Sequence, residues 1–255
     1  MTAAASGTEL FQYLLRLGDT SLVLGHRLSE WCGHGPALEE DLALANIALD
    51  LIGQARLLLQ YAGTVEGIGR SEDDLAYLRD GRDYRNLLLV EQPNGHYGDT
   101  IARQFLFDAF AVELWADLTR SSDAHIAAVA GKAIKEHQYH WRHSSGWMIR
   151  LGDGTDDSHA RMQAALEQLW PYTGEMLTPD DVDEAMRAAR IGPDLAAIEP
   201  RWNARVGAVL TESTLMRPDD GWMQRGGKTG RHSEHLGHLL AEMQSVHRAY
   251  PGATW

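Results

Sequence analysis

Two neighbouring segments, residues 99–121 and 123–151, carry acidic and imidazole side chains within otherwise apolar helical stripes. Side chains that recur every three or four positions lie along one face of a helix, and an apolar face of this kind packs against a core. The stripes are Ile101, Phe105, Asp108, Val112 and Trp115, then Val129, Ala133, Glu136, His140, His143 and Trp147. We therefore predict two packed helices that bring carboxylates and imidazoles into a shared interior.

The first part of the chain has the same helical periodicity. Thr8 fits the N-cap of a first helix, and the glycine and proline residues of segment 33–36 end it. We expect a second helix over residues 39–61, antiparallel to the first because the connection is short. The stripe predicted to face the core of this second helix is Leu42, Ala45, Leu49, Ile52 and Leu59.

Helical signals continue to the end of the chain. Shorter helices are expected within residues 71–92 and at 156–170, 179–190, 194–211 and 232–249. We find no segment with the alternating pattern of a β-strand. The pattern predicts a single all-α domain over residues 1–255, with a four-helix bundle core at about 8–151 and a helical C-terminal extension at about 155–255.

When residues are counted outward from the turn of each long hairpin, several polar side chains fall at similar levels along the axis of the bundle. This predicted cluster comprises Asp19, Asp50, Asp108, Glu136 and His140. Ferritin-like di-iron proteins place carboxylates at such positions and add a Glu-x-x-His motif on two of the four helices. Here Gly53 and Tyr139 stand three residues after Asp50 and Glu136, and the motif does not occur in the sequence. We therefore predict a vestigial polar cluster that binds no metal.

A buried carboxylate needs a compensating partner, because removing a charge from water without one costs several kcal/mol. The cationic and imidazole side chains that could supply it are Arg56, Arg103, Lys135, His140 and His143.

Two further groups of residues suggest sites near the C-terminus. His232, His235 and His238 are three residues apart, a spacing that drifts around a helix, so we expect surface or interface histidines and no zinc site. Trp222 and Trp255 lie in glycine-rich or terminal stretches, and we expect them to contact another protein chain.

Composition excludes several classes of protein. The formal net charge of −13 disfavours nucleic acids and anionic membrane surfaces as partners. The lone Cys32 cannot form an internal disulfide, and we see neither a secretion signal nor a long uninterrupted apolar run. We expect a cytoplasmic protein that spans no membrane.

Five separate segments, in order, resemble one protein family. They are residues 40–55 (EDLALANIALDLIGQA), 92–96 (QPNGH), 151–155 (LGDGT), 170–175 (WPYTGE) and the tail from Gly230 through 236–244 (LGHLLAEMQ) to 251–255 (PGATW). The chain resembles the C subunits of bacterial phenylacetyl-CoA epoxidases over nearly its whole length.

The resemblance implies a ferritin-like, non-catalytic subunit of a multicomponent monooxygenase in phenylacetate breakdown. Such an enzyme uses dioxygen and NADPH electrons to epoxidise the aromatic ring of phenylacetyl-CoA. The resemblance further implies that a catalytic A subunit holds the di-iron centre, that this chain holds no cofactor, and that a reductase is among the other subunits. The isolated chain could self-associate.

Two other functions remain open from the residues alone. The chain could be an independent metal-dependent oxidase that uses Glu136 and His140, or a free-standing helical binding protein.

Overall fold

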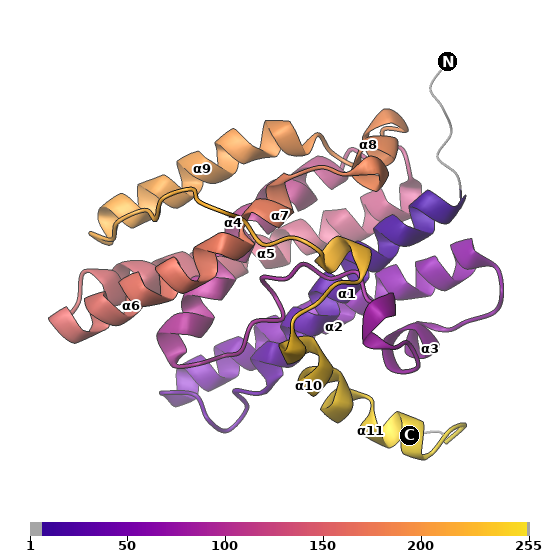
Figure 1. Cartoon of the computed structure of the whole chain (residues 1–255), viewed down its shortest axis with the longest axis horizontal. Helices are drawn as coiled ribbons and strands as arrows, with labels where there is room; N and C mark the ends of the chain where they lie inside the picture. Colours follow the sequence, from indigo (N-terminus) through magenta and orange to yellow (C-terminus); the bar gives the residue numbers. More distant parts are fainter. Residues whose placement is uncertain (1–6, 254–255) are drawn as a thin grey trace. The chain divides into compact units, whose positions relative to one another are not determined.

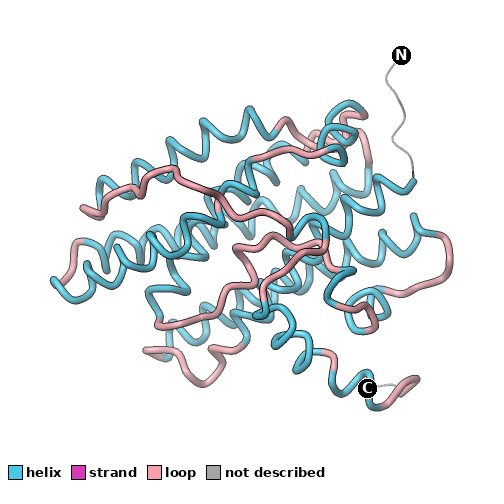
Figure 2. The backbone as a smooth tube through the Cα atoms, in the orientation of Figure 1, coloured by secondary structure: helices cyan, strands magenta, loops and turns pink. Residues whose placement is uncertain are grey.

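The computed structural model describes residues 7–253, and within that range every regular element is a helix (Figure 2). The all-α prediction is therefore confirmed, and the helices pack as in a bundle. Contacts group them into two compact units. The middle unit comprises Pro93–Arg225, and the terminal unit comprises the described residues 7–92 and 226–253. This division differs from the expected core and extension; that the whole chain forms one domain stays a prediction.

The terminal unit is built on a hairpin of two long helices, α1 (Gly7–Ser29) and α2 (Leu38–Glu66) (Figure 1). Two glycines allow their close approach. A Cβ atom added to Gly18 would lie 2.9 Å from Cδ2 of Leu59, and one added to Gly25 would lie 3.0 Å from Cγ1 of Ile52. Because protein interiors are close-packed, a side chain at Gly18 would displace the Leu59 side chain, and one at Gly25 would also crowd the backbone oxygen of Ala48 at 3.2 Å.

The buried face of α2 differs from the predicted one. Leu42 and Leu49 are 55% and 66% exposed, so their assignment to the core was wrong. The residues that do face the interior include Leu44, Ile47, Ala48, Leu51, Ala55, Leu58 and Leu59. Apolar residues surround much of this helix, and periodicity alone cannot choose a core face when two faces are apolar.

Both ends of the chain contribute to the terminal unit. Its shorter helices are α3 (Glu72–Tyr77), η1 (Gly81–Asp83), η3 (Gly227–Thr229), α10 (Glu234–Met243) and α11 (Ser245–Ala249). The side-chain amide of Gln244 donates to the carbonyl oxygens of Ala76 at 3.2 Å and Arg79 at 3.0 Å. The C-terminal segment is thus bonded to α3 and to the loop that follows it.

The middle unit contains the second long hairpin, α4 (Tyr97–Leu118) and α5 (Ala124–Gly152), with α6 (Asp156–Leu169) and α9 (Leu195–Glu212) packed on it (Figure 1). Shorter helices are η2 (Trp170–Tyr172), α7 (Gly174–Leu177) and α8 (Asp181–Ala188).

Polar side chains cap the helices of the middle unit. The Asp123 carboxylate accepts hydrogen bonds from the backbone of His125 and Ile126, and Thr155 forms a capping box with Ser158. Each cap satisfies backbone donors that the first turn of a helix leaves without a partner. Thr155 therefore fixes the start of α6, the helix expected over residues 156–170.

Helix α2 is also long and apolar enough, by length and composition alone, to cross a membrane. In the structure, 44% of its most apolar stretch is buried against other helices. A core helix of a soluble protein can have the same length and composition, so this property gives only weak support for a membrane span.

Candidate functional site

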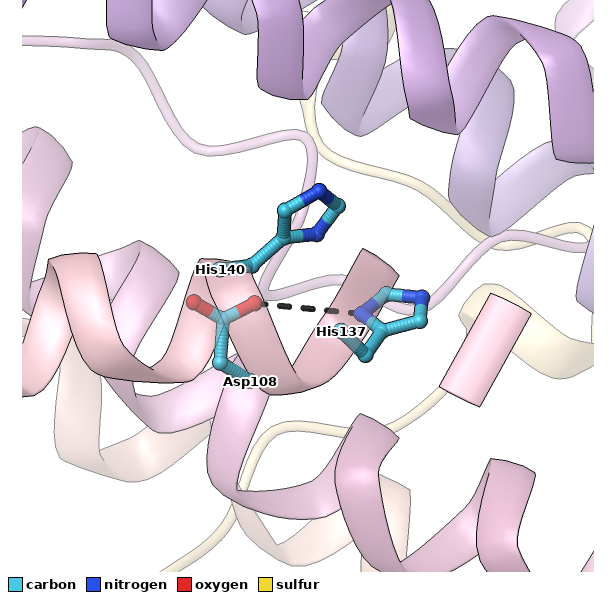
Figure 3. Close-up of side chains that lie close together, drawn as sticks. All are labelled: Asp108, His137 and His140. Atoms are coloured by element: carbon cyan, nitrogen blue, oxygen red, sulfur yellow. Dashed lines mark ion pairs between the residues drawn. The ribbon is translucent and has the colours of Figure 1, made fainter. Parts of the chain in front are cut away.

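Asp108, His137 and His140 form a compact cluster inside the middle unit (Figure 3). Asp108 projects from α4, and the two histidines project from α5. All three side chains are fully buried, and each offers one nitrogen or oxygen atom that lies within 4.8 Å of the other two. The cluster is the only group of this kind found among the described residues.

Helix geometry explains why these three side chains meet. His137 and His140 are three positions apart, so they lie on the same face of α5. The α4–α5 hairpin sets that face against Asp108 of α4. The centroids of the His137 and His140 rings are 5.0 Å apart, and the angle between the ring planes is 75°. The edge of one ring therefore faces the other ring.

Hydrogen bonds hold the Asp108 carboxylate in place. Its Oδ1 accepts from Nε2 of Gln104 at 2.7 Å, and its Oδ2 accepts from Oγ of Ser144 at 2.8 Å. Burial raises the pKa of Asp108 to about 7, although His140 and the two hydrogen bonds oppose this shift. The carboxyl group is therefore poised between its neutral and charged forms near neutral pH.

Burial lowers the pKa of His137, whereas it raises that of Asp108. Desolvation, and then the proximity of His140, hold the pKa of His137 well below the ordinary value. Its Nδ1 lies 4.0 Å from Oδ1 of Asp108, and its ring stacks against Trp115 with centroids 6.0 Å apart. His137 is therefore a neutral imidazole, the form that can bind a metal.

The other predicted cluster residues have different environments. In the terminal unit, Asp19 is fully buried in an ion pair with Arg79 and accepts the backbone N–H of Arg85 at 2.8 Å. Asp50 is half-buried on α2. Glu136 of α5 forms an ion pair at 3.3 Å with Lys132, whose side chain is largely exposed.

The partner of Asp19 was not among the expected cations. Arg79 lies in the loop after α3, and its guanidinium also donates to the carbonyl oxygen of Asp83 at 3.0 Å. Arg56, which was expected to compensate a buried acid, instead pairs with Glu72 at the surface.

Sequence reasoning identified Asp108 and His140 but missed His137. The counting of register placed Glu136 opposite Asp108, whereas the next residue, His137, takes that place. One residue rotates a helical position by about 100°. The signal that could have found it is the His-x-x-His spacing of residues 137 and 140, which puts two imidazoles on one helix face.

Among the C-terminal candidates, His232 is placed differently from the expectation. His232 was expected at a surface or interface, but its side chain is only 6% exposed, and its Nδ1 lies 2.8 Å from Oε2 of Glu91. His235 is half-buried, while His238 and Trp222 are exposed. Trp255 lies outside the described residues.

The cluster could hold a metal ion but does not fit a di-iron centre. Two imidazoles and one carboxylate are ligands that zinc and ferrous iron accept. A ferritin-like di-iron site draws about six ligands from four helices, with carboxylates in the majority. The Asp19 carboxylate already accepts hydrogen bonds from the Arg79 guanidinium and the backbone N–H of Arg85. Among the described residues, no second carboxylate belongs to the group of Asp108, His137 and His140.

Two comparisons with known proteins bear on the role of the chain. The family model described as "Phenylacetic acid catabolic protein" matches residues 1–255. The C subunit of 1,2-phenylacetyl-CoA epoxidase from Escherichia coli (strain K12) is 51% identical over 247 residues, which cover 97% of this chain and 99% of that protein.

Proposed function

Because this chain belongs to the phenylacetic acid catabolic protein family, we propose that it is a non-catalytic subunit of a multicomponent phenylacetyl-CoA epoxidase. In this proposal it supports a separate catalytic subunit during phenylacetate breakdown in the cytoplasm. A reductase that delivers NADPH electrons would complete the enzyme.

The observation that carries the proposal is the 51% identity to the C subunit of an epoxidase over 97% of the chain. The composition of the buried cluster supports it, because the residues present do not fit a di-iron centre. The di-iron centre that activates dioxygen is accordingly assigned to the partner catalytic subunit. This chain's contribution is to bind and stabilise that subunit.

The exposed side of α2 is the surface that best suits a partner helix. Leu38, Leu42 and Leu49 are 72%, 55% and 66% exposed, and their spacing of four and seven residues aligns them along the helix. An apolar row of this length on a stable helix is typical of an obligate interface, whose centre is apolar and closely packed.

The C-terminal segment is a weaker interface candidate than the sequence suggested. Trp222 is exposed, but His232 and Gln244 bond to residues of their own unit. Truncation of the tail would therefore destabilise the chain itself as well as any interface. Substitutions on α2 test the interface more directly.

The test is co-expression of the chain with its catalytic partner. A Leu42→Gln and Leu49→Gln double variant should weaken co-purification at least tenfold, because buried interface leucines would meet a polar surface. The isolated variant should unfold with the wild-type midpoint, since both side chains are exposed in the chain alone. Met216→Gln, which changes an exposed apolar residue of the middle unit (73% exposed), is the matched control.

Two measurements on these complexes separate the alternatives. Turnover per assembled complex should match wild type even where assembly is weak, which is the behaviour of a supporting subunit. Epoxidation by the iron-loaded chain alone, with loss of activity on Glu136→Gln, would establish an independent oxidase instead. A catalytic subunit that is fully soluble and active without this chain would contradict the supporting role.

A further inference from the structure

We propose that Asp108, His137 and His140 bind one divalent first-row transition-metal ion through two imidazole nitrogens and one carboxylate oxygen. This inference concerns the middle unit alone and goes beyond the supporting role proposed above.

The first argument is geometric. Ligand atoms around a tetrahedral zinc ion are roughly 3.4 Å apart, given bonds of about 2.0–2.1 Å. Here the three atoms lie within 4.8 Å of one another, and Nδ1 of His137 is 4.0 Å from Oδ1 of Asp108. Shifts of about 1 Å, achieved by small side-chain rotations, would close the set around one ion.

The second argument is that the carboxylate is already oriented. Gln104 of α4 and Ser144 of α5 each donate to a different oxygen of Asp108, at 2.7 Å and 2.8 Å. In metal sites, such hydrogen bonds from surrounding residues fix the direction of the ligand oxygens. Both donors are themselves fully buried, so the carboxylate cannot turn freely toward water.

The third argument concerns an acceptor that has no donor. The side-chain oxygen Oε1 of Gln104 is buried and receives no hydrogen bond within the described part of the chain. It belongs to the same amide whose nitrogen donates to Asp108. A water molecule on the open coordination position of a three-ligand site needs such an acceptor.

The surroundings also favour a cation. Asp108 is buried without an Arg or Lys partner among the described residues, so a divalent ion would supply the missing positive charge. The aromatic rings of Phe107 and Trp115 flank His137, and such an apolar shell strengthens the attraction between ion and ligands.

The decisive measurement is the metal content of the folded full-length chain. Cells would be grown in minimal medium supplied in turn with Zn²⁺, Fe²⁺ or Co²⁺, because the buried site must be filled as the chain folds. We expect one ion per chain in at least one medium. Comparison of the metal content after growth with zinc and with iron identifies the ion that the site prefers. The cobalt-bound chain should show visible d–d absorption.

Three variants assign the ion to this cluster. His140→Gln and Asp108→Asn should each abolish stoichiometric binding and the cobalt spectrum. His143→Gln makes the same substitution one turn further along α5, outside the three-residue set, and should retain both. Gln104→Leu should weaken affinity by about 10–100-fold, the usual effect of losing a residue that orients a ligand.

Several results would overturn the proposal. One is a folded wild-type chain that lacks metal from all three media; another is a metal content that His140→Gln and Asp108→Asn leave unchanged. If these variants do not fold, X-ray absorption of the wild-type cobalt form decides, and fewer than two imidazole ligands would contradict the site. Two irons per chain would contradict both this site and the supporting role, whereas loss of partner binding would contradict only the latter.

Discussion

Two fully buried aspartates on long helices, Asp19 of α1 and Asp108 of α4, are held in opposite ways. Asp19 binds the guanidinium of Arg79 and a backbone N–H. Asp108 accepts two hydrogen bonds from neutral side chains, and the imidazole of His137 lies 4.0 Å away. The two residues occupy equivalent positions in the sequence pattern but have different chemistry.

The difference shows that the partner decides what a buried acid can do. A guanidinium remains protonated at all accessible pH values and engages both carboxylate oxygens, so the carboxylate cannot bind a metal as well. A buried imidazole can be neutral and can bind a metal beside the carboxylate. Asp19 is thus structural, whereas Asp108 retains the capacity to act as a ligand.

The largest effect expected from this comparison is at Asp19. Asp19→Asn should lower the free energy of unfolding by about 3–5 kcal/mol, because it leaves the Arg79 guanidinium buried without a counter-charge. Urea unfolding at neutral pH measures this loss. The double replacement Asp19→Leu with Arg79→Met should recover part of it. A loss below about 1 kcal/mol in the single variant would show that Asp19 is not a structural ion-pair partner.

Glu91, a second buried acid of the terminal unit, pairs with His232, and this pair gives a pH-dependent test. Burial lowers the pKa of His232, but its hydrogen bond and attraction to Glu91 outweigh this effect, and the net shift is upward. The resulting stability is complete below the unfolded pKa of about 6.5 and is lost as pH rises through the higher folded value.

His232→Gln should therefore cost about 1.5–3 kcal/mol at pH 5.5, the usual contribution of a hydrogen bond to a charged group, and less at pH 9. Unfolding midpoints across this range provide the measurement. His238→Gln, at an exposed position of α10, is the control. Equal losses at both pH values would show that the charge of His232 contributes nothing.

A smaller effect is expected at Asp108. In the metal-free chain, Asp108→Asn should change the free energy of unfolding by at most about 1.5 kcal/mol, because a neutral amide of the same shape leaves no cation unpaired. Urea unfolding after chelation checks this value. A loss as large as that of Asp19→Asn would mean that Asp108 compensates a buried cation.

The smallest effect is expected at the surface pair of Arg56 and Glu72, whose atoms are 3.3 Å apart with the arginine side chain 72% exposed. Arg56→Gln should change the free energy of unfolding by less than about 1 kcal/mol, because water screens an exposed pair. The change should shrink further in high salt. A salt-independent loss above that value would place Arg56 in a buried network.

The helices could be predicted from the sequence because their signals are local. Asp123 and Thr155 cap α5 and α6 where short polar side chains precede periodic segments. The buried face of α2 could not be predicted in this way, since it depends on which of two apolar faces packs against α1. That choice depends on long-range contacts such as those at Gly18 and Gly25.

Only two residues of the candidate site, Asp108 and His140, could be predicted from the sequence. The third depends, like the buried face of α2, on how two helices pack. Asp108 and His140 stand out as polar residues in apolar stripes, but pairing them correctly requires the register of α4 against α5 to within one residue. Arg79 could not be assigned to Asp19 at all, because the two residues are 60 positions apart in the sequence. Arg79 lies in a loop, and a loop has no helical periodicity that would show which of its side chains points into the core.

The terminal unit joins residues from both ends of the chain, and this arrangement affects how the protein can fold during synthesis. Glu91 is translated long before His232 and Ser233, which bond to its carboxylate. Gln244, which donates to the carbonyl oxygens of Ala76 in α3 and Arg79 in the loop after it, emerges from the ribosome later still. Domains generally form as units while the chain is made, starting from the N-terminus. Here the terminal unit cannot be complete until residues 226–253 have been made, whereas all described residues of the middle unit precede them in the sequence.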